Sequence, residues 1–298
     1  MNKNQSWLGI LCVSLACILW GSIGMGVKFL YNEGLTAMDT IEVRSITGAV
    51  VVGIYILIRD KSLFKIDLKH IWIFIGTGIL NMMLNGFCYC YCLELTDMAT
   101  TAAFNATGPM FALMFGCILF NEKLTARKLG AIVCTFSGCL LLSGFTGGDK
   151  VPTLGVIMGL MGAVGYSMYS VFSRFAIQRN YNAITITFYS LVICAIGCAC
   201  FTNWPVTIAC ATTKLSNWIW ILLLGVGDGF LGYLLYTKGL EYIEIGTAAI
   251  LSSLDLLTSA VLGILVFSEK LTGRVAGGIL FILFGIFVSN YEFKKLKK

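Results

Sequence analysis

The sequence predicts an all-α integral membrane protein with ten transmembrane helices, arranged as two inverted five-helix repeats. Three observations lead to this prediction. The 298 residues are 58% hydrophobic and only 12% charged, with a mean hydropathy of +0.86, whereas soluble chains hold roughly 25% charged residues. Apolar runs long enough to span a bilayer recur along the chain, and the second half repeats motifs of the first.

The apolar runs define the spans. Each covers about 20 residues, enough to cross a hydrocarbon core of ~30 Å as a helix. Helices are expected because lipid offers no partners to free backbone polar groups. The predicted spans are 8–28, 38–58, 70–93, 98–120, 127–145, 154–176, 182–202, 217–237, 245–267 and 273–291.

The basic residues orient these spans. With the N-terminus in the cytoplasm, roughly three quarters of the 21 lysines and arginines fall in cytoplasmic segments, as the positive-inside rule predicts. We therefore expect a multi-pass protein of the cytoplasmic (inner) membrane with both termini in the cytoplasm. The formal charge of +6 follows from this distribution, so no nucleic-acid partner is expected.

The chain shows no pattern typical of a metal centre or a catalytic site. His70 is the single histidine, and the 12 cysteines lie in apolar runs without a C-x-x-C pair. Cysteine in such runs is most simply a small packing residue. We expect no metal, no cofactor and no enzymatic activity.

An internal repeat divides the chain into residues 1–148 and 149–298. The motif Asn121-Glu-Lys-Leu-Thr-Ala-Arg returns as Ser268-Glu-Lys-Leu-Thr-Gly-Arg, at an offset of 147 residues. Each half holds five predicted spans, so the second half is inverted relative to the first. Inverted repeats are typical of alternating-access carriers, which bind substrate near the midplane between the repeats.

These features resemble the EamA family of the drug/metabolite transporter superfamily, over essentially the whole chain. The resemblance rests on Leu19-Trp20-Gly21-Ser22, on Arg44, on Pro109 and on the Glu-Lys-Leu-Thr junctions at Glu122 and Glu269. It implies a ten-helix carrier with a central cavity lined mainly by helices 1, 3, 4, 6, 8 and 9. It implies no particular substrate, because relatives carry amino acids, other metabolites and drugs.

The chain departs from this family in the ninth span. A Glu-Pro pair is common there, whereas this sequence has Asp255-Leu256. The acid is kept but the proline is absent, so the bend that Pro109 would give the first repeat is not assured in the second.

Two acids stand in the middle of predicted spans. Asp228 and Asp255 each follow about ten residues of span, and so lie ~15 Å deep at 1.5 Å per residue. A carboxyl group at that depth is costly unless it faces a cavity or a partner. Either acid could bind an amine or exchange a proton, or could be a protonated group held by a neighbouring helix.

Polar and aromatic residues accompany these acids. Amides and hydroxyls one turn apart could line a cavity or join helices by hydrogen bonds. Aromatic rings could bind a cation, or simply pack. The offset of 147 pairs Asp228 with Asn81, and an offset of 146 pairs Trp20 with Tyr166. The predicted substrate-binding residues are Trp20, Asn81, Asn85, Asn105, Tyr166, Asp228, Tyr233, Ser252 and Asp255.

Other charged residues are assigned structural roles. Arg44 is expected to pair with Glu42, although an Arg44 that reached the cavity could take a carboxylate. Glu122 and Glu269 are expected to fix helix hairpins, and Thr125 is a good N-cap for the helix after it.

The sequence therefore predicts a secondary transporter that moves a small organic metabolite, an amino acid or a related amine, by alternating access, with protons as a candidate coupling ion. The main alternative is a multidrug exporter for lipophilic cations. An intramembrane enzyme is less favoured, because it would leave the inverted repeat unexplained and the chain lacks the histidines and paired catalytic motifs that such chemistry needs. A passive channel is also less favoured; flux that never saturates and shows no counterflow would indicate one. Whether the protein forms a homodimer stays open. Motifs such as Gly155-x-x-x-Gly159 permit close helix contact, but they more often pack inside a bundle than between subunits.

Overall fold

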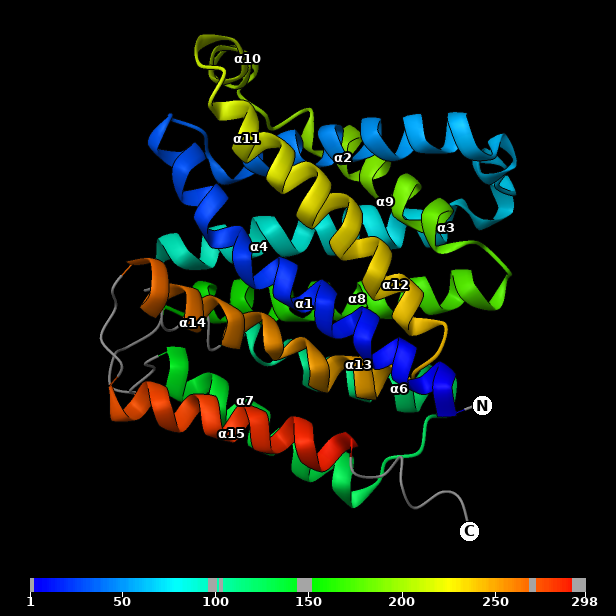
Figure 1. Cartoon of the computed structure of the whole chain (residues 1–298), viewed down its shortest axis with the longest axis vertical. Helices are drawn as coiled ribbons and strands as arrows, with labels where there is room; N and C mark the ends of the chain where they lie inside the picture. Colours follow the sequence, from blue (N-terminus) through cyan, green and yellow to red (C-terminus); the bar gives the residue numbers. More distant parts are fainter. Residues whose placement is uncertain (1–2, 96–100, 102–103, 144–151, 268–271, 291–298) are drawn as a thin grey trace.

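The computed structural model describes residues 3–95, 101, 104–143, 152–267 and 272–290. Over these residues the chain is a bundle of helices without a β-strand (Figure 1). The first half contains α1 (Lys3–Asn32), α2 (Ala37–Arg59), η1 (Lys61–Phe64), η2 (Leu68–His70), α3 (Ile71–Ile75), η3 (Gly76–Met83), α4 (Leu84–Leu95), α6 (Gly108–Phe120) and α7 (Ala126–Ser143).

The second half begins with a long helix and ends with another. It contains α8 (Thr153–Gln178), α9 (Ala183–Cys198), α10 (Trp204–Thr213), α11 (Asn217–Leu222), η4 (Leu223–Gly232), α12 (Tyr233–Leu240), α13 (Ile245–Ser252), α14 (Leu254–Phe267) and α15 (Gly273–Asn290). In the described residues, helices occupy all ten of the predicted ranges. The short helix α10 lies outside those ranges, at one end of the bundle (Figure 1).

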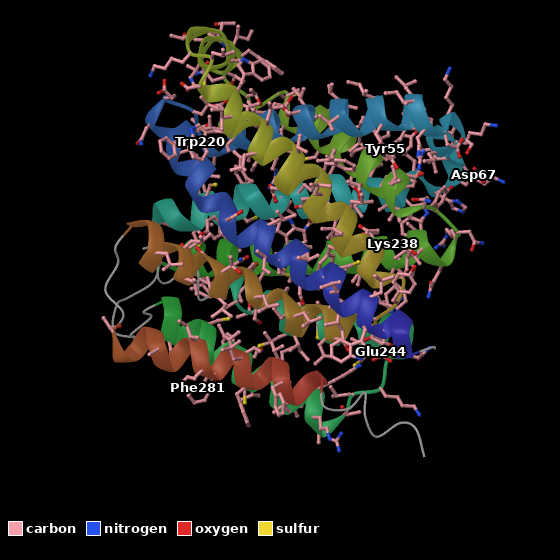
Figure 2. All side chains as sticks on the ribbon, in the orientation of Figure 1. Tyr55, Asp67, Trp220, Lys238, Glu244 and Phe281 are labelled. Carbon is pink, nitrogen blue, oxygen red and sulfur yellow. The ribbon has the colours of Figure 1, made fainter. Side chains whose placement is uncertain are left out.

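Several helices have the length and composition to cross a membrane. Among the described residues, four continuous helices meet both criteria: Ala37–Arg59, Leu68–Cys92, Thr153–Gln178 and Asn217–Leu240. The shorter apolar helices are Ser6–Ser22, Gly108–Phe120, Ala183–Cys198, Ile245–Ser259 and Ala276–Val288. Large apolar side chains such as Phe281 point outward from the bundle (Figure 2), as lipid-facing side chains do.

The helices of the two halves pack in reciprocal pairs. α7 packs along α15 and α2 along α9, while α4 packs on α8 as α12 packs on α1. The sequence offset relates α7 to α15, α2 to α9, α1 to α8 and α4 to α12. The contact between α4 and α8 is therefore repeated as the contact between α12 and α1. This is the pattern expected of two halves related by a two-fold axis. α1 begins and α15 ends at the same end of the bundle (Figure 1).

Two helices contain π-helical segments at matching positions. η3 begins at Gly76 and η4 begins at Leu223, which are separated by the repeat offset of 147 residues. π-helical turns are rare and occur frequently at functional sites. The two segments carry Asn81 and Asp228, so both halves place a polar group in an irregular turn.

The helix before α14 is interrupted although it lacks a proline. α13 ends at Ser252 and α14 begins at Leu254. The Ser252 hydroxyl donates to the Ala249 carbonyl at 2.7 Å, and the Asp255 carboxylate accepts the N–H of Leu256. Such side-chain bonds compete with helical hydrogen bonds. The second half therefore has an interruption at Ser253, beside polar side chains that bond the backbone and without a proline.

Candidate functional site: a polar cavity at the centre of the bundle

A cavity of about 190 Å³ lies among the helices and is called here the central cavity. It is lined by eight of the nine predicted residues, and Arg44, Tyr169, Ser170 and Tyr236 complete the lining. The ninth predicted residue, Ser252, lines an adjoining cavity of about 170 Å³ that shares four lining residues with the first, Asp255 among them. The structure thus brings the predicted residues together. Whether each one binds substrate stays a prediction.

Asp228 is paired with Arg44. Its Oδ2 lies 2.8 Å from the Arg44 Nη1 atom, and the two side chains are only 3% and 15% exposed. The expected pair between Arg44 and Glu42 is wrong. Residues two apart on a helix point in different directions, and Arg44 turns toward η4 while Glu42 is buried elsewhere, 1% exposed.

Asp255 has a different environment. It lies just after the helix interruption and lines both cavities. Within the described part of the chain, no lysine or arginine forms an ion pair with it. The charged residues that line the two cavities are Arg44, Asp228 and Asp255. Because the first two neutralise each other, Asp255 determines the net charge of the site.

The two asparagines of helix segments η3 and α4 connect to α8. The Asn81 amide nitrogen donates to the carbonyls of Gly165 and Tyr166, both at 3.2 Å. The Asn85 amide nitrogen donates to the Gly162 carbonyl at 2.7 Å. These donors therefore hold two helices together, which is one of the two roles expected for them. Their side chains nevertheless line the cavity.

Aromatic rings form one wall of the central cavity. The Trp20 ring lies 5.1 Å from that of Tyr233 and 5.0 Å from that of Tyr236, centroid to centroid. The hydroxyls of two tyrosines are used within the protein: Tyr169 bonds Thr237 at 2.6 Å and Tyr236 bonds Ser170 at 2.8 Å. Aromatic faces beside an acid are a favourable environment for an ammonium group.

Several buried polar atoms around the central cavity have no hydrogen-bond partner among the described residues. They are the donors Trp20 Nε1 and Arg44 Nε and the acceptors Asn81 Oδ1 and Asp228 Oδ1. Buried polar atoms are nearly always paired in proteins, so each such atom calls for an explanation. A polar ligand or water in the cavity would supply the missing partners.

A third cavity, of about 220 Å³, continues from the central cavity toward the end of α1. It shares Arg44, Asn85 and Tyr233 with the central cavity. Val27 and Tyr31 of α1 face residues of α4 across this cavity, and α2 and η4 supply further lining residues. The hollow part of the molecule therefore extends toward one end of the bundle.

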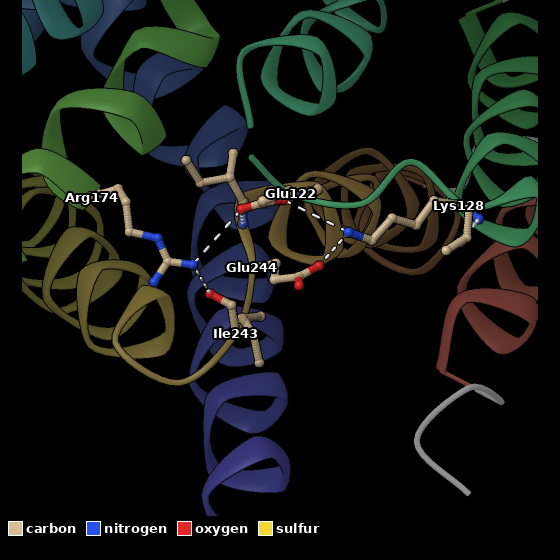
Figure 3. Close-up of polar contacts among 8 residues, drawn as sticks. Glu122, Lys128, Arg174, Ile243 and Glu244 are labelled. Carbon is tan, nitrogen blue, oxygen red and sulfur yellow. Dashed lines mark hydrogen bonds and ion pairs between the residues drawn. The ribbon is translucent and has the colours of Figure 1, made fainter. Parts of the chain in front are cut away.

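At the opposite end of the bundle lies a charged network that includes Glu122 (Figure 3). Asn121 ends α6 with a left-handed φ of 53°, and the next residue turns back toward the bundle. The Glu122 carboxylate accepts the N–H groups of Ile245 and Gly246, at 2.7 and 3.0 Å. Glu122 therefore stabilises a helix hairpin, and that hairpin is the one before α13 in the other half. Its counterpart Glu269 lies outside the described residues.

Two basic side chains complete this network. Arg174 donates to the carbonyls of Leu240 and Ile243, at 2.6 and 2.8 Å. Lys128 lies 3.8 Å from the Glu122 carboxylate and pairs with Glu244. The backbone N–H of Lys128 is in turn held by the hydroxyl of Thr125 at 3.2 Å, which confirms Thr125 as an N-cap.

Among the lining residues outside the predicted set, Tyr89 and Cys139 show what the repeat could and could not indicate. Tyr89 lines two of the cavities and is the counterpart of Tyr236 at the offset of 147, so the repeat contained that signal. Cys139 of α7 lines the adjoining cavity, and nothing distinguishes it in sequence from the other cysteines. In the described residues, no cluster of histidine, cysteine and acidic side chains is suited to hold a metal ion.

Comparison with known proteins places these features in context. Residues 7–144 and 153–291 each match the model of the EamA-like transporter family. An uncharacterized transporter from Archaeoglobus fulgidus is 24% identical over 285 residues, which cover 95% of this chain and 97% of the relative. The uncharacterized transporter YxxF from Bacillus subtilis is 21% identical over 259 residues, covering 86% and 80%.

Two further likenesses extend over the whole chain. The uncharacterized inner membrane transporter YicL from Salmonella typhimurium is 20% identical over an alignment that covers 96% of each protein. A solved crystal structure superposes with a TM-score of 0.79 over 100% of both chains, at 19% sequence identity. That likeness establishes a shared fold.

Proposed function

Because this chain belongs to the EamA-like transporter family, we propose that it is a secondary transporter that moves a small organic metabolite by alternating access. Amino acids and related amines are the substrate class we favour. Residues 1–148 and 149–298 would form the two inverted repeats, with the site near the midplane between them. The protein would reside in the cytoplasmic membrane with both termini in the cytoplasm.

The observation that supports this substrate class is an acid in the central cavity, Asp255, that forms no ion pair among the described residues. Arg44 and Asp228 neutralise each other at 2.8 Å, and Asp255 is left as the acid that faces both cavities. A carboxylate in a low-dielectric cavity favours a cationic partner, since an uncompensated charge there is costly. The ammonium group of an amine or amino acid, or a proton, would supply that charge.

The favoured substrate within this class is zwitterionic. Arg44 lines the central cavity together with Asp255, and its Nε atom has no partner among the described residues. A substrate carboxylate could accept from this guanidinium while the ammonium group lies at Asp255 beside the aromatic wall. The unpartnered atoms of Trp20 and Asn81 would then meet the remaining polar groups.

The size and polarity of the site favour a metabolite over a bulky drug. The two adjoining cavities that contain Asp255 measure about 170 and 190 Å³, so together they lie at the lower end of the roughly 300–1,000 Å³ of pockets for drug-sized ligands. Export of lipophilic cations is the second candidate function, because an acid beside aromatic rings would also attract them. A panel of such cations in the same assay separates the two.

The test is uptake of labelled amino acids and their decarboxylated amines into proteoliposomes, with and without a pH gradient. We expect saturable uptake in the wild type, and a loss of about ten-fold or more in Asp255→Asn, the factor given by one interaction of ~1.4 kcal/mol. Stimulation by the gradient would support proton coupling. Asp60→Asn, at an exposed acid after α2, is the matched control and should transport normally.

Two results would contradict parts of this proposal. Unchanged uptake in Asp255→Asn would reduce Asp255 to a structural acid. If the folded wild-type protein carries neither amino acids nor amines, the substrate class is wrong.

A further inference from the structure

The charged network around Glu122 holds a hairpin of the second half of the chain at both of its ends. The hairpin is residues 241–244, between α12 and α13. The Glu122 carboxylate binds the N–H groups at the start of α13. The Arg174 guanidinium binds carbonyls at the end of α12 and in the hairpin. Each charge matches the dipole of the helix end it meets, an acid at the N-terminus and a base at the C-terminus.

The surroundings leave space for this carboxylate. A Cβ atom at Gly116 would lie 2.9 Å from Glu122 Oε2, and one at Gly246 would lie 3.3 Å from the same atom. Both values are shorter than ordinary van der Waals contact, so the Glu122 carboxylate would have to shift if either glycine carried a Cβ atom. The Glu122 side chain is 5% exposed. The buried contact between Glu122 and the start of α13 therefore joins the first half of the chain to the second.

Between the network and the central cavity, α8 and α12 are joined at successive turns. Tyr169 bonds Thr237 and Ser170 bonds Tyr236, at 2.6 and 2.8 Å, and Arg174 then reaches the Leu240 carbonyl at 2.6 Å. We call this row of contacts the α8–α12 seam. These contacts hold α8 and α12 together from the central cavity to the hairpin.

The corresponding seam in the other half is open. The repeat offset maps α8 onto α1 and α12 onto α4, with Tyr89 at the position of Tyr236. Between Val27 and Tyr31 of α1 and Tyr89 of α4 lies the 220 Å³ cavity that continues from the central cavity. The two seams are thus in opposite states in one structure, closed at one end and open at the other.

We propose that Glu122 and Arg174 form the gate at the closed end of the transport path, and that release of the 241–244 hairpin opens this end while the α1–α4 seam closes. By the distribution of basic residues this is the cytoplasmic mouth. The gate rests on the proposed transport function, since only a carrier needs two mouths that open in turn. It does not depend on the substrate class.

Hydrogen–deuterium exchange on the full-length protein in lipid nanodiscs tests this gate without a substrate. Glu122→Gln removes the charge that holds two backbone N–H groups. We expect about ten-fold faster exchange at the amides of Ile245 and Gly246, the factor for loss of one charge-assisted hydrogen bond. At the same time, amides of residues 84–92 in α4 should exchange more slowly, because the α1–α4 seam closes. Glu241→Gln is the matched control: it breaks a pair between the hairpin and Lys238 in the last turn of α12, within the second half alone, and should leave residues 84–92 unchanged.

The response of residues 84–92 decides between a gate and a simple helix cap. Faster exchange confined to residues 241–248 would overturn the proposal, and so would no change at either site. Should Glu122→Gln fail to fold, Arg174→Gln is measured in its place with the same two outcomes. Reciprocal exchange together with absent amino-acid and amine uptake would uphold the gate and reject the substrate class alone.

Discussion

At the scale of single residues, the two mid-span acids play different parts. Asp228 is 3% exposed and pairs with Arg44, whereas Asp255 has no ion-pair partner in the described part of the chain. Both were predicted from the same depth in their spans. The difference comes from a partner 184 residues away, on a helix outside those that the family resemblance implies for the cavity.

Substitutions of Arg44 and Asp228 should have strongly coupled effects on the free energy of unfolding. Breaking a buried pair from one side leaves an uncompensated charge and costs about 3–5 kcal/mol. We expect Arg44→Gln and Asp228→Asn each to lower the free energy of unfolding by about this amount, and the double variant to lose clearly less than the sum. Denaturation in detergent micelles measures it. Additive losses would show that the pair is not coupled, and Glu33→Gln, which breaks an exposed pair with Lys214, is the control.

Depth and helical spacing were sufficient to predict the residues around Asp255. Span depth identified the acids, and one-turn spacing identified Asn81, Asn85 and Ser252. The sequence could not predict what Glu122 binds, because its partners are backbone N–H groups, which any residue supplies. Nor could it exclude the pair of Glu42 with Arg44 without considering the direction of each side chain.

At the scale of elements, a close approach of α2 and η4 positions the Arg44–Asp228 pair. A Cβ atom added at Gly225 would lie 2.5 Å from Thr47 Cβ and 3.2 Å from the Gly48 nitrogen. Both atoms are part of, or attached to, the backbone, so they cannot rotate away. Glycine at this position is therefore required for the two helices to approach closely enough for the pair to form.

Changing either of two glycines in η4 to alanine should have very different effects on the free energy of unfolding. Gly225→Ala forces the helices apart and should lower the free energy of unfolding by about 1–3 kcal/mol, the usual cost of overpacking. Gly227→Ala meets no described atom within 4 Å and should be neutral, or stabilising by up to about 1 kcal/mol from helix propensity. Unfolding in detergent compares them. Equal effects would mean that the contact with α2 is not tight.

The sequence predicts a helix interruption in the first half of the chain but not the one in the second half. Pro109 indicates a bend in the first half, but in the second half the interruption at Ser253 arises from side-chain hydrogen bonds of Ser252 and Asp255. These residues also fit a regular helix, so the sequence alone leaves the choice open. The sequence does not predict α10 for another reason: its ten residues are too few to span a membrane, and the apolar runs predict only membrane spans.

At the scale of the whole molecule, the halves hold each other. Glu122 of the first half binds the start of α13 in the second, and Arg44 of the first binds Asp228 of the second. Composition and the repeat were enough to predict an all-helical membrane protein. The contacts between halves depend on three-dimensional geometry and could not be read from either half.

Both ends of the chain should be accessible from one side of the membrane. α1 begins and α15 ends at the same end of the bundle (Figure 1), and the basic residues predict that this side is cytoplasmic. Short epitope tags at the N-terminus and after Lys298 should bind antibody only in permeabilised cells. A tag inserted after Lys214 should bind in intact cells. Labelling of the two ends from different sides would contradict the predicted orientation.

The π-helical segments have a consequence for insertions and deletions. A π turn accommodates one residue more than an α turn, so removing one residue within Leu223–Gly232 would let the helix become regular. Because a π turn winds through less angle per residue than an α turn, the helix on either side of the deletion would keep nearly the same orientation. Tyr233 and Tyr236 would stay at the cavity wall, whereas residues inside the segment, Asp228 among them, would change direction and lose their alignment with α2. Selection on the Arg44–Asp228 pair would therefore preserve the extra residue of this segment.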